Sequence, residues 1–263
     1  MAKDDKGLQH IGDILPAIIT PGMKPLTPIQ ERLISMPLQD YEEVDILYQH
    51  SVLCQTCMPY RDPGDVRTWQ RHNGIVHLLI QAGQALNPTQ KVFMDVGLPF
   101  GPKPRLVLYH LNTEALRKQS PLIDLEDSLT AFVKRTLGLD PGGRNIRTVK
   151  DQLTRLAAAD FRLGALYDDH AVTIKGTVIE GFDLWIPRDP RQRMLWPTTV
   201  QFSTRYFESL VRHAVPLNEA AVSRLSHSAM GLDLYTWLAQ RLHRVDPKKN
   251  AFVPWVSIKE QFG

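Results

Sequence analysis

The sequence predicts an α+β fold, with strands gathered in its first part and helices in its second. Three observations support this class for the 263-residue chain. Runs rich in β-branched and apolar residues, bounded by turn-forming residues, lie before residue 101. Helical periodicity dominates from residue 102. Strand-like and helical runs then alternate in the last third, within a composition that is 43% hydrophobic and 22% charged and thus typical of globular proteins.

The first hundred residues divide into an arm and a group of strands. Five prolines punctuate residues 1–40, which predicts an irregular arm over residues 1–43. Residues 44–60 and 75–83 have the composition of strands. Residues 92–101 form a third predicted strand.

Two helices are predicted next. Residues 102–120 are apolar almost all round a helix, which predicts that this helix is central and buried. Residues 122–138 carry one apolar stripe and end at Gly138, a residue type favoured just past a helix end. The stripe consists of Leu129, Phe132, Val133 and Leu137.

A third helix is predicted within residues 140–163, DPGGRNIRTVKDQLTRLAAADFRL. At about 100° per residue, Val149, Leu153 and Leu156 share one side and form its core stripe. The opposite side is basic. It consists of Arg144, Arg147, Lys150, Thr154 and Arg155.

Two strand-like runs, 161–169 and 170–186, follow this helix and are joined by a turn at Asp168–Asp169. Three helices followed by a β-hairpin is the order of a winged helix, whose third helix presents one face to DNA. The predicted DNA contacts on this helix are Arg144, Arg147, Lys150 and Arg155. A solvated surface is the alternative interpretation of the same basic side.

The last third repeats this organisation. Residues 198–203 form a predicted strand, and residues 203–213 and 218–226 form predicted helices. A longer helix spans residues 228–245, with Ser228 as its N-cap. Its predicted apolar side consists of Met230, Leu234, Trp237, Leu238 and Leu242. A short strand and a short helix are predicted within the closing residues 251–263.

These elements predict tandem winged-helix modules. The expected division is an arm (1–43), strands plus a first module (44–187), a basic linker (188–197) and a second module (198–263). The second module is expected to be truncated before its recognition helix, since that helix should come after the turn at its end. In the linker, the further predicted phosphate contacts are Arg188, Arg191 and Arg193.

Charge and targeting signals narrow the function classes. Residues 101–162 carry 11 Lys/Arg and 7 Asp/Glu, a net charge of +4, which favours a polyanionic partner. The N-terminus lacks the apolar run of a signal peptide, and no segment reaches the roughly 18 apolar residues of a membrane helix. We therefore expect a cytoplasmic protein with no membrane partner.

The two cysteines, Cys54 and Cys57, invite a metal or redox interpretation. A zinc site needs about four ligands, and no histidine has finger-like spacing to this pair. If the segment is a strand, the two side chains point to opposite faces, which is poor for chelation. We predict a structural pair, and keep a Cys-dependent redox or metal protein as the remote alternative.

Catalytic and cofactor motifs give no support for an enzyme. The glycines near residues 101 and 142–143 do not fit the phosphate loop G-x-x-x-x-G-K-[ST]. H-E-x-x-H and G-x-S-x-G are both missing from the sequence. Asp168, Asp169 and His170 lie at the expected hairpin tip, where acidic turn residues are common. We predict no catalytic residue, no cofactor and no metal.

Five segments occur here in an order that resembles the RepA family of bacterial plasmid replication initiators. They are GLPFGPKPRLVLYHLNTEAL, SLTAFVKRTLGLDPGGR, VKDQLTRLAAADFRL, SAMGLDLYTWLAQRL and VPWVSIKEQFG. The resemblance covers about residues 45–263, and the closing W-x-x-x-K-x-Q-F-G is its sharpest element.

The resemblance implies a non-enzymatic protein built from winged-helix modules that binds repeats in double-stranded origin DNA. It also implies recruitment of host replication machinery, namely the helicase or its loader, and a possible homodimer. In related initiators the first module often mediates dimerisation and phosphate contact, whereas the second reads bases. A winged-helix transcriptional regulator is the alternative function, because initiators often repress their own promoters.

Overall fold

The computed structural model describes residues 45–74, 76–87, 90–124, 133–134, 143–166, 171–182, 199–242, 245–246, 248 and 251–263. The described residues belong to one compact unit, Val44–Gly263. The predicted arm, most of the predicted helix 122–138 and the predicted linker 188–197 lie outside the described residues. The mixed helix and strand content of the described residues confirms the α+β class.

The described residues form helices α3 (Pro102–Lys118), α5 (Gly143–Ala158), α6 (Thr204–His213), α7 (Glu219–Leu225), α8 (Ala229–Leu242) and α9 (Trp255–Phe262). The longer strands are β1 (Ile46–His50), β2 (Thr68–Asn73), β3 (Val76–Gln81), β7 (Asp160–Leu166), β8 (Ala171–Thr177) and β11 (Ala214–Asn218). Shorter strands are β4 (Gln84–Asn87), β5 (Val92–Asp95), β6 (Leu122–Asp124), β9 (Ile179–Phe182) and β10 (Thr199–Phe202).

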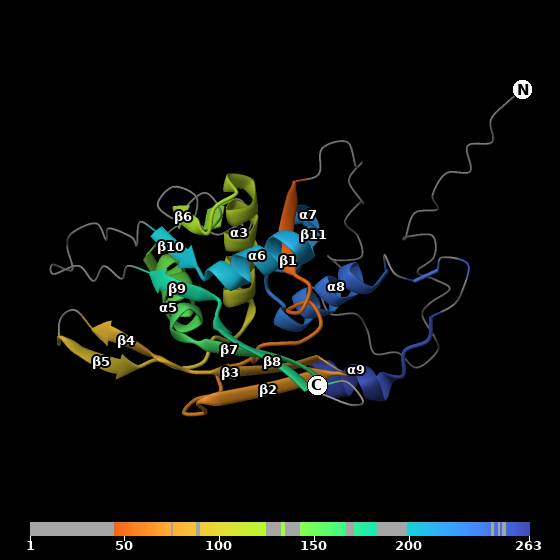
Figure 1. Ribbon diagram of the computed structural model, residues 1–263, viewed down its shortest axis with the longest axis horizontal. Coiled ribbons are helices and arrows are strands. Elements are labelled where there is room, and N and C mark those ends of the chain that lie inside the picture. The colour runs from red at the N-terminus through yellow and green to blue at the C-terminus, as the bar shows by residue number, and fades with distance from the viewer. Residues whose placement is uncertain are drawn as a thin grey trace, which may run out of the picture. The chain divides into compact units, whose positions relative to one another are not determined.

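An antiparallel sheet of four strands, in the order β2-β3-β7-β8, underlies the helices (Figure 1). Strands β2 and β3 meet at a tight turn in which Gly74 has a φ of 55°, a left-handed conformation that glycine adopts without strain. One face of the sheet packs into the core through Leu78, Ile80 and Phe161. The other face, which receives the alternate side chains of each strand, carries mainly polar residues such as Gln70, His72 and Arg162. The predicted hairpin 161–186 is therefore part of a larger sheet.

Helix α3 is the central element of the core. It buries both apolar and polar residues along its length, from Pro104 to Ala115, which confirms the predicted central helix. Helix α5 packs beside it, and its side chains Val149, Leu153 and Leu156 are buried as the predicted core stripe. The core is thus closed by two helices lying over one face of the sheet (Figure 1).

A second, two-stranded sheet joins the start of the described unit to its later part. Strand β1 pairs antiparallel with β11, from Ile46 opposite Asn218 to His50 opposite Ala214. A third sheet has the order β6-β10-β9. Residues that the sequence assigned to two separate modules therefore share one hydrogen-bonded ladder.

Several predicted strands are wrong in extent. The strand predicted over 44–60 ends at His50, because the backbone then turns and the Cys54 N–H donates to the His50 carbonyl at 3.2 Å. The strand predicted over 92–101 is limited to Val92–Asp95. Residues 122–124 form strand β6 instead of the start of a helix, because β10 pairs with them.

The predicted strand 170–186 is divided at Val178. Its first part pairs with β7 as β8, whereas its second part, β9, pairs with β10 in another sheet. The bend is held by Ser203, whose backbone N–H donates to the Val178 carbonyl at 3.1 Å and whose hydroxyl donates to the Thr177 carbonyl at 2.7 Å. The residues of the expected turn, 167–170, lie outside the described residues.

The C-terminal helices agree with the prediction more closely. Ser228 does cap α8, with its Oγ accepting from the Gly231 N–H at 3.0 Å. The apolar side of α8 is, however, turned partly to solvent, and Met230, Leu238 and Leu242 are exposed. Trp237 is buried as predicted and Leu234 is half-buried, but the buried side also includes Leu232, Asp233, Thr236 and Gln240. Residues 251–254 form no strand, and α9 begins directly after them.

Candidate nucleic-acid interface

Helix α5 separates an apolar side from a side that faces solvent. Its buried stripe of Val149, Leu153 and Leu156 fixes the rotation of the helix against α3. Arg147, on the opposite side, is exposed. Strand β7 begins at Asp160, two residues after the helix ends, so the hairpin β7–β8 leaves from the C-terminal end of this helix. The helix and its hairpin thus have the local order of a winged helix.

Lys150 lies on the same side as Arg147 but is half-buried. Partial burial lowers the pKa of its ammonium group, because leaving water disfavours the charged form. Arg147 and Lys150 thus lie on the side of α5 opposite the buried stripe, and contact of either side chain with phosphate stays a prediction.

Arg155 has a different environment from Arg147. Its Nε donates to Asp151 Oδ2 at 3.0 Å, and its Nη1 donates to the Leu98 carbonyl at 3.4 Å. The guanidinium also lies over the Phe100 ring, 5.1 Å from its centroid. These interactions tie the C-terminal end of α5 to the segment before α3. A role in DNA binding remains a prediction for Arg155.

The other predicted contacts lie beyond the part of the chain whose side chains are described. The backbone of Arg144 belongs to α5, but its side chain lies outside the described residues, as do Arg188, Arg191 and Arg193.

The polar face of the four-stranded sheet is a feature that the sequence reasoning missed. A shallow groove of about 580 Å³ on this sheet is lined by residues that include Gln70, His72, His77 and Arg162. His72 and His77 are directly paired across β2 and β3, with ring centroids 5.6 Å apart. Part of the signal was present in the sequence, because Gly74 is the first residue of the two-residue loop between β2 and β3, a position where glycine favours a tight hairpin.

A buried ion pair connects α3 with α8. The guanidinium of Arg105 binds Asp233 in a bidentate manner, with Nε–Oδ1 and Nη2–Oδ2 distances of 2.7 Å each. It also donates to the carbonyls of Met58, Pro59 and Gly101, so that it fixes the loop after β1. Removing two charges from water is costly, and these additional hydrogen bonds offset part of that cost. We call Arg105, Asp233 and the loop 54–60 the polar junction.

Both cysteines belong to the polar junction. Cys54 and Cys57 are buried and free, and burial raises the pKa of each thiol. Cys57 Sγ donates to the Gln261 carbonyl at 3.4 Å. The Cys57 side chain packs in one hydrophobic cluster with the rings of Trp237 and Phe262. The segment around Cys54 and Cys57 is a turn and not a strand, so the two side chains do not point to opposite faces of a sheet. Both thiols are nevertheless buried. Protonated thiols without access to solvent are poor nucleophiles and metal ligands.

The pair His50–Ser209 resembles a catalytic base and nucleophile, with 2.9 Å between Nε2 and Oγ. The other ring nitrogen, Nδ1, accepts from the Val52 N–H at 3.2 Å. The neutral ring must therefore carry its proton on Nε2 and donate it to Ser209, which is the wrong tautomer for a general base. Burial, and secondarily the nearby His213, lowers the pKa of His50 to about 4, which keeps this tautomer neutral.

The described residues contain neither a cluster of metal-binding side chains nor a membrane-spanning helix. No group of three or more His, Cys, Asp or Glu side chains there is placed to hold a metal ion. No helix in the same part of the chain is both long and apolar enough to cross a bilayer.

A comparison with protein-family models decides the family. Residues 98–257 match the model described as plasmid encoded RepA protein, which covers more than half of the chain. The chain belongs to this RepA family. The match includes α3, α5, the hairpin β7–β8 and α8, and it confirms the resemblance seen in the sequence. It supports a plasmid replication initiator.

Comparisons with individual proteins add little. No curated protein matches the chain. Among solved structures, domains 2 and 3 of RctB are similar at 12% identity and a TM-score of 0.47, with 72% of this chain and 68% of that chain covered. A second structure of RctB domains 2–3 covers 74% of this chain and 70% of that chain at the same identity and TM-score.

Proposed function

We propose that this RepA-family chain is a non-enzymatic replication initiator that binds double-stranded DNA at the plasmid origin. The observation that carries the proposal is the division of α5 into a buried apolar stripe and an opposite side with the exposed Arg147 and the half-buried Lys150. A helix of this kind, with a hairpin directly after it, is the arrangement that a winged helix presents to DNA. We also propose tandem winged-helix modules, from the order of elements in the sequence and the family resemblance, with the two modules joined by the ladders β1–β11 and β6–β10–β9.

Within this proposal the basic side of α5 positions the protein on phosphate groups. Arginine and lysine contacts to phosphate carry no sequence information by themselves, so these side chains should strengthen binding to all duplexes equally. Arg144 and the linker residues Arg188, Arg191 and Arg193 are proposed as additional phosphate contacts from the sequence alone. We propose that other parts of the protein contact the bases.

The proposal is tested by the salt dependence of DNA binding. Arg147→Ala with Lys150→Ala should weaken binding to origin repeats and to unrelated duplexes alike. The slope of log K against log salt should fall by roughly 0.9 for each phosphate that the variant no longer neutralises. Fluorescence anisotropy over a salt series measures both quantities.

A matched control removes the same charge elsewhere. Lys248→Ala with Lys259→Ala changes two exposed residues, the second of them on α9, and should leave the slope unchanged. An unchanged slope for the α5 variant, with its fold intact by circular dichroism, would reject the phosphate contact.

The finer functions come from the family resemblance. We propose that the protein acts in the cytoplasm, recognises repeats at the origin and recruits the host helicase or its loader, and that it forms a homodimer. Footprinting on the DNA that flanks its own gene tests the recognition of repeats. Clustered and evenly spaced protection is expected for an initiator, whereas a single protected promoter site indicates a transcriptional regulator.

A further inference from the structure

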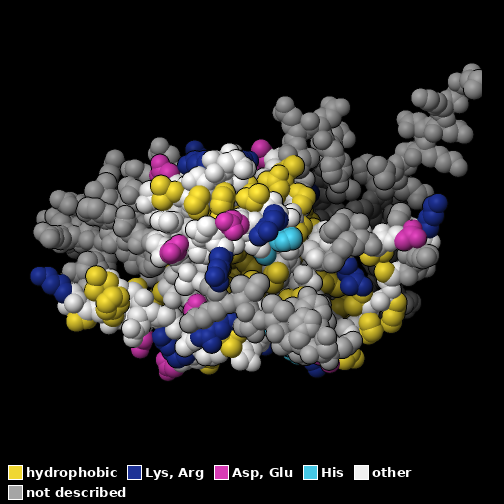
Figure 2. Space-filling view, viewed as in Figure 1, with side chains coloured by type: hydrophobic (Ala, Val, Ile, Leu, Met, Phe, Trp, Pro, Cys, Tyr) yellow, Lys and Arg dark blue, Asp and Glu magenta, His cyan; other side chains and the backbone are white. Residues whose placement is uncertain are grey.

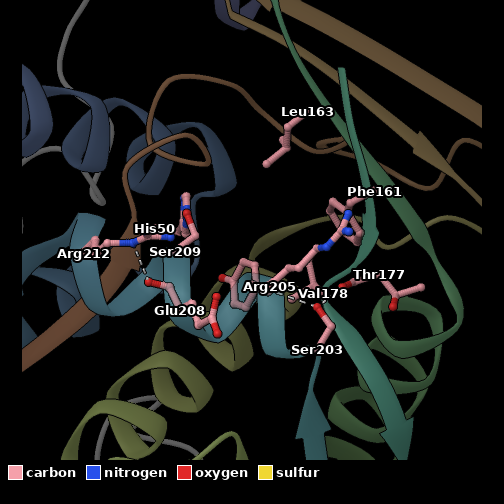
Figure 3. A pocket seen from close by; sticks show the side chains of 11 residues that line it. His50, Phe161, Leu163, Thr177, Val178, Ser203, Arg205, Glu208, Ser209 and Arg212 are labelled. Carbon is pink, nitrogen blue, oxygen red and sulfur yellow. Dashed lines mark hydrogen bonds between the residues drawn. The ribbon is translucent and has the colours of Figure 1, made fainter. Parts of the chain in front are cut away.

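A cavity of about 360 Å³ lies between helix α6, the core face of strand β7 and the end of β8 (Figure 3). Its apolar wall is formed by Phe161, Leu163 and Val178. Leu163 is only half-buried, so part of the apolar sheet face is left uncovered here. A site of this size is within the range of small-ligand pockets, and it exceeds the roughly 150 Å³ that can hold one benzene molecule.

One stripe of α6 supplies the polar side of the cavity. Arg205, Ser209 and Arg212 succeed one another at intervals of four and three residues, so they lie on the same side of the helix. All three line the cavity, and the two arginines are exposed at its mouth. In Figure 2, basic side chains and a histidine border a recess with a hydrophobic floor over this helix.

Ser209 is held in a state that favours donation. Its Oγ accepts a hydrogen bond from His50 Nε2, because Nδ1 of that ring is occupied as an acceptor. The hydroxyl proton of Ser209 can therefore be directed to an oxygen inside the cavity. Two guanidinium groups and one hydroxyl then offer donors to an anionic group, and the apolar wall offers a surface for the rest of the ligand.

The charges at the mouth limit the size of the anion. Glu208 also lines the cavity, so two arginines are opposed by one carboxylate. A polyanion such as DNA would be repelled by Glu208 and could not enter so small a cavity. A single carboxylate group, or a phosphate in its singly charged form, matches the local excess of one positive charge. Arg212 Nε also donates to the Glu208 carbonyl at 3.2 Å, so its Nη groups are the ones offered to the ligand.

We propose that this cavity binds a small organic anion, an aromatic or similarly apolar body that carries one phosphate or carboxylate group. The ligand would contact both β7 and α6, and thus link the hairpin after α5 to the helix that packs on β1. This site is separate from the side of α5 proposed to bind DNA. Its test needs no DNA, so it stands or fails independently of the proposed function.

The probes are phenyl phosphate, benzoate, inorganic phosphate and phenol, titrated against the whole chain by saturation-transfer NMR and calorimetry. Phenyl phosphate and benzoate should bind, and inorganic phosphate and phenol should bind at least about fivefold more weakly, since each lacks one half of the interaction. If phenol binds as tightly as phenyl phosphate, the cavity does not recognise an anionic group and the proposal is wrong.

Variants locate the site. Arg205→Ala with Arg212→Ala should weaken phenyl phosphate binding at least about fivefold, as expected for partly exposed ion pairs. Leu163→Trp should block the cavity sterically, whereas the control Arg61→Gln should leave binding unchanged. The arginine variants change only exposed side chains and remain informative if Leu163→Trp does not fold. Unaltered binding in the arginine variant, or no binding of phenyl phosphate at millimolar concentration, contradicts the proposal.

Discussion

The polar junction and the outer side of α5 use the same residue type for opposite purposes. Arg105 is 1% exposed and makes five hydrogen bonds to groups of its own chain. Arg147 faces solvent on α5. A buried guanidinium must satisfy its charge within the protein, whereas an exposed one can exchange water for a phosphate at little cost. Burial, and not residue type, thus separates a structural arginine from a candidate DNA contact.

The difference extends to the neighbours of each region. Around β1 and α3, polar side chains form an internal network in which Asn112 donates to Gln49 at 2.8 Å and accepts from the Tyr206 hydroxyl at 2.9 Å. Along α5, Asp151 and Arg155 pair at the surface instead. Partly satisfied buried networks are costly, so changes in the first region should affect stability far more than changes in the second.

The largest effect is expected at Asp233. Asp233→Ala leaves the Arg105 charge buried without its partner, which should lower the free energy of unfolding by about 3–5 kcal/mol. Urea denaturation measures this loss. In the double variant with Arg105→Met, the two effects should be less than additive, with a coupling of about 0.5–3 kcal/mol. Simple additivity would show that the pair contributes nothing as a pair.

The next effect concerns pH and His50. The pKa of His50 is lowered from 6.5 to about 4, so between these values the unfolded chain binds a proton that the folded chain does not. The contribution of neutral His50 to the free energy of unfolding should therefore be fully present above pH 6.5. Below pH 6.5 the free energy of unfolding should fall by about 1.4 kcal/mol per pH unit, about 3 kcal/mol in all. His50→Gln should flatten this part of the curve. The exposed His72→Gln serves as control, and an equally flattened curve there would contradict the assignment.

A smaller effect is expected for Arg155, which lies between the two extremes. Arg155→Ala removes its interactions with Asp151, Leu98 and the Phe100 ring, and should cost about 1 kcal/mol of stability. Thermal unfolding gives the value. A loss as large as that of Asp233→Ala would place Arg155 with the buried network and not with the surface.

The smallest effect on stability is expected for Arg147. Arg147→Ala should change the free energy of unfolding by no more than about 0.5 kcal/mol, because its side chain faces solvent. The same variant should weaken DNA binding, as measured by anisotropy over a salt series. Strong destabilisation by this variant would remove the basis of the comparison, since Arg147 would then have a structural role.

The predictable parts of the molecule are those with a regular period. The 3.6-residue period located α5, its buried stripe and the solvent position of Arg147 from the sequence alone. Ser228 was identifiable as a cap because side-chain capping is a local interaction. Family membership was readable from five ordered segments. The hairpin turn at Gly74 was equally local, and with it strands β2 and β3 could have been paired.

Tertiary structure alone decided where the polar groups of the core find partners. Arg105 and Asp233 are 128 residues apart, and no period or spacing relates them. With Asp233 buried in this pair, Leu238 and Leu242 of α8 face solvent. The apolar stripe of the sequence had predicted that both leucines are buried. The pairing of β1 with β11 ends the first strand at His50 and places Cys54 and Cys57 in a buried turn. Local propensity fixes a segment's period, but the partner that satisfies a buried donor is chosen only when distant segments meet.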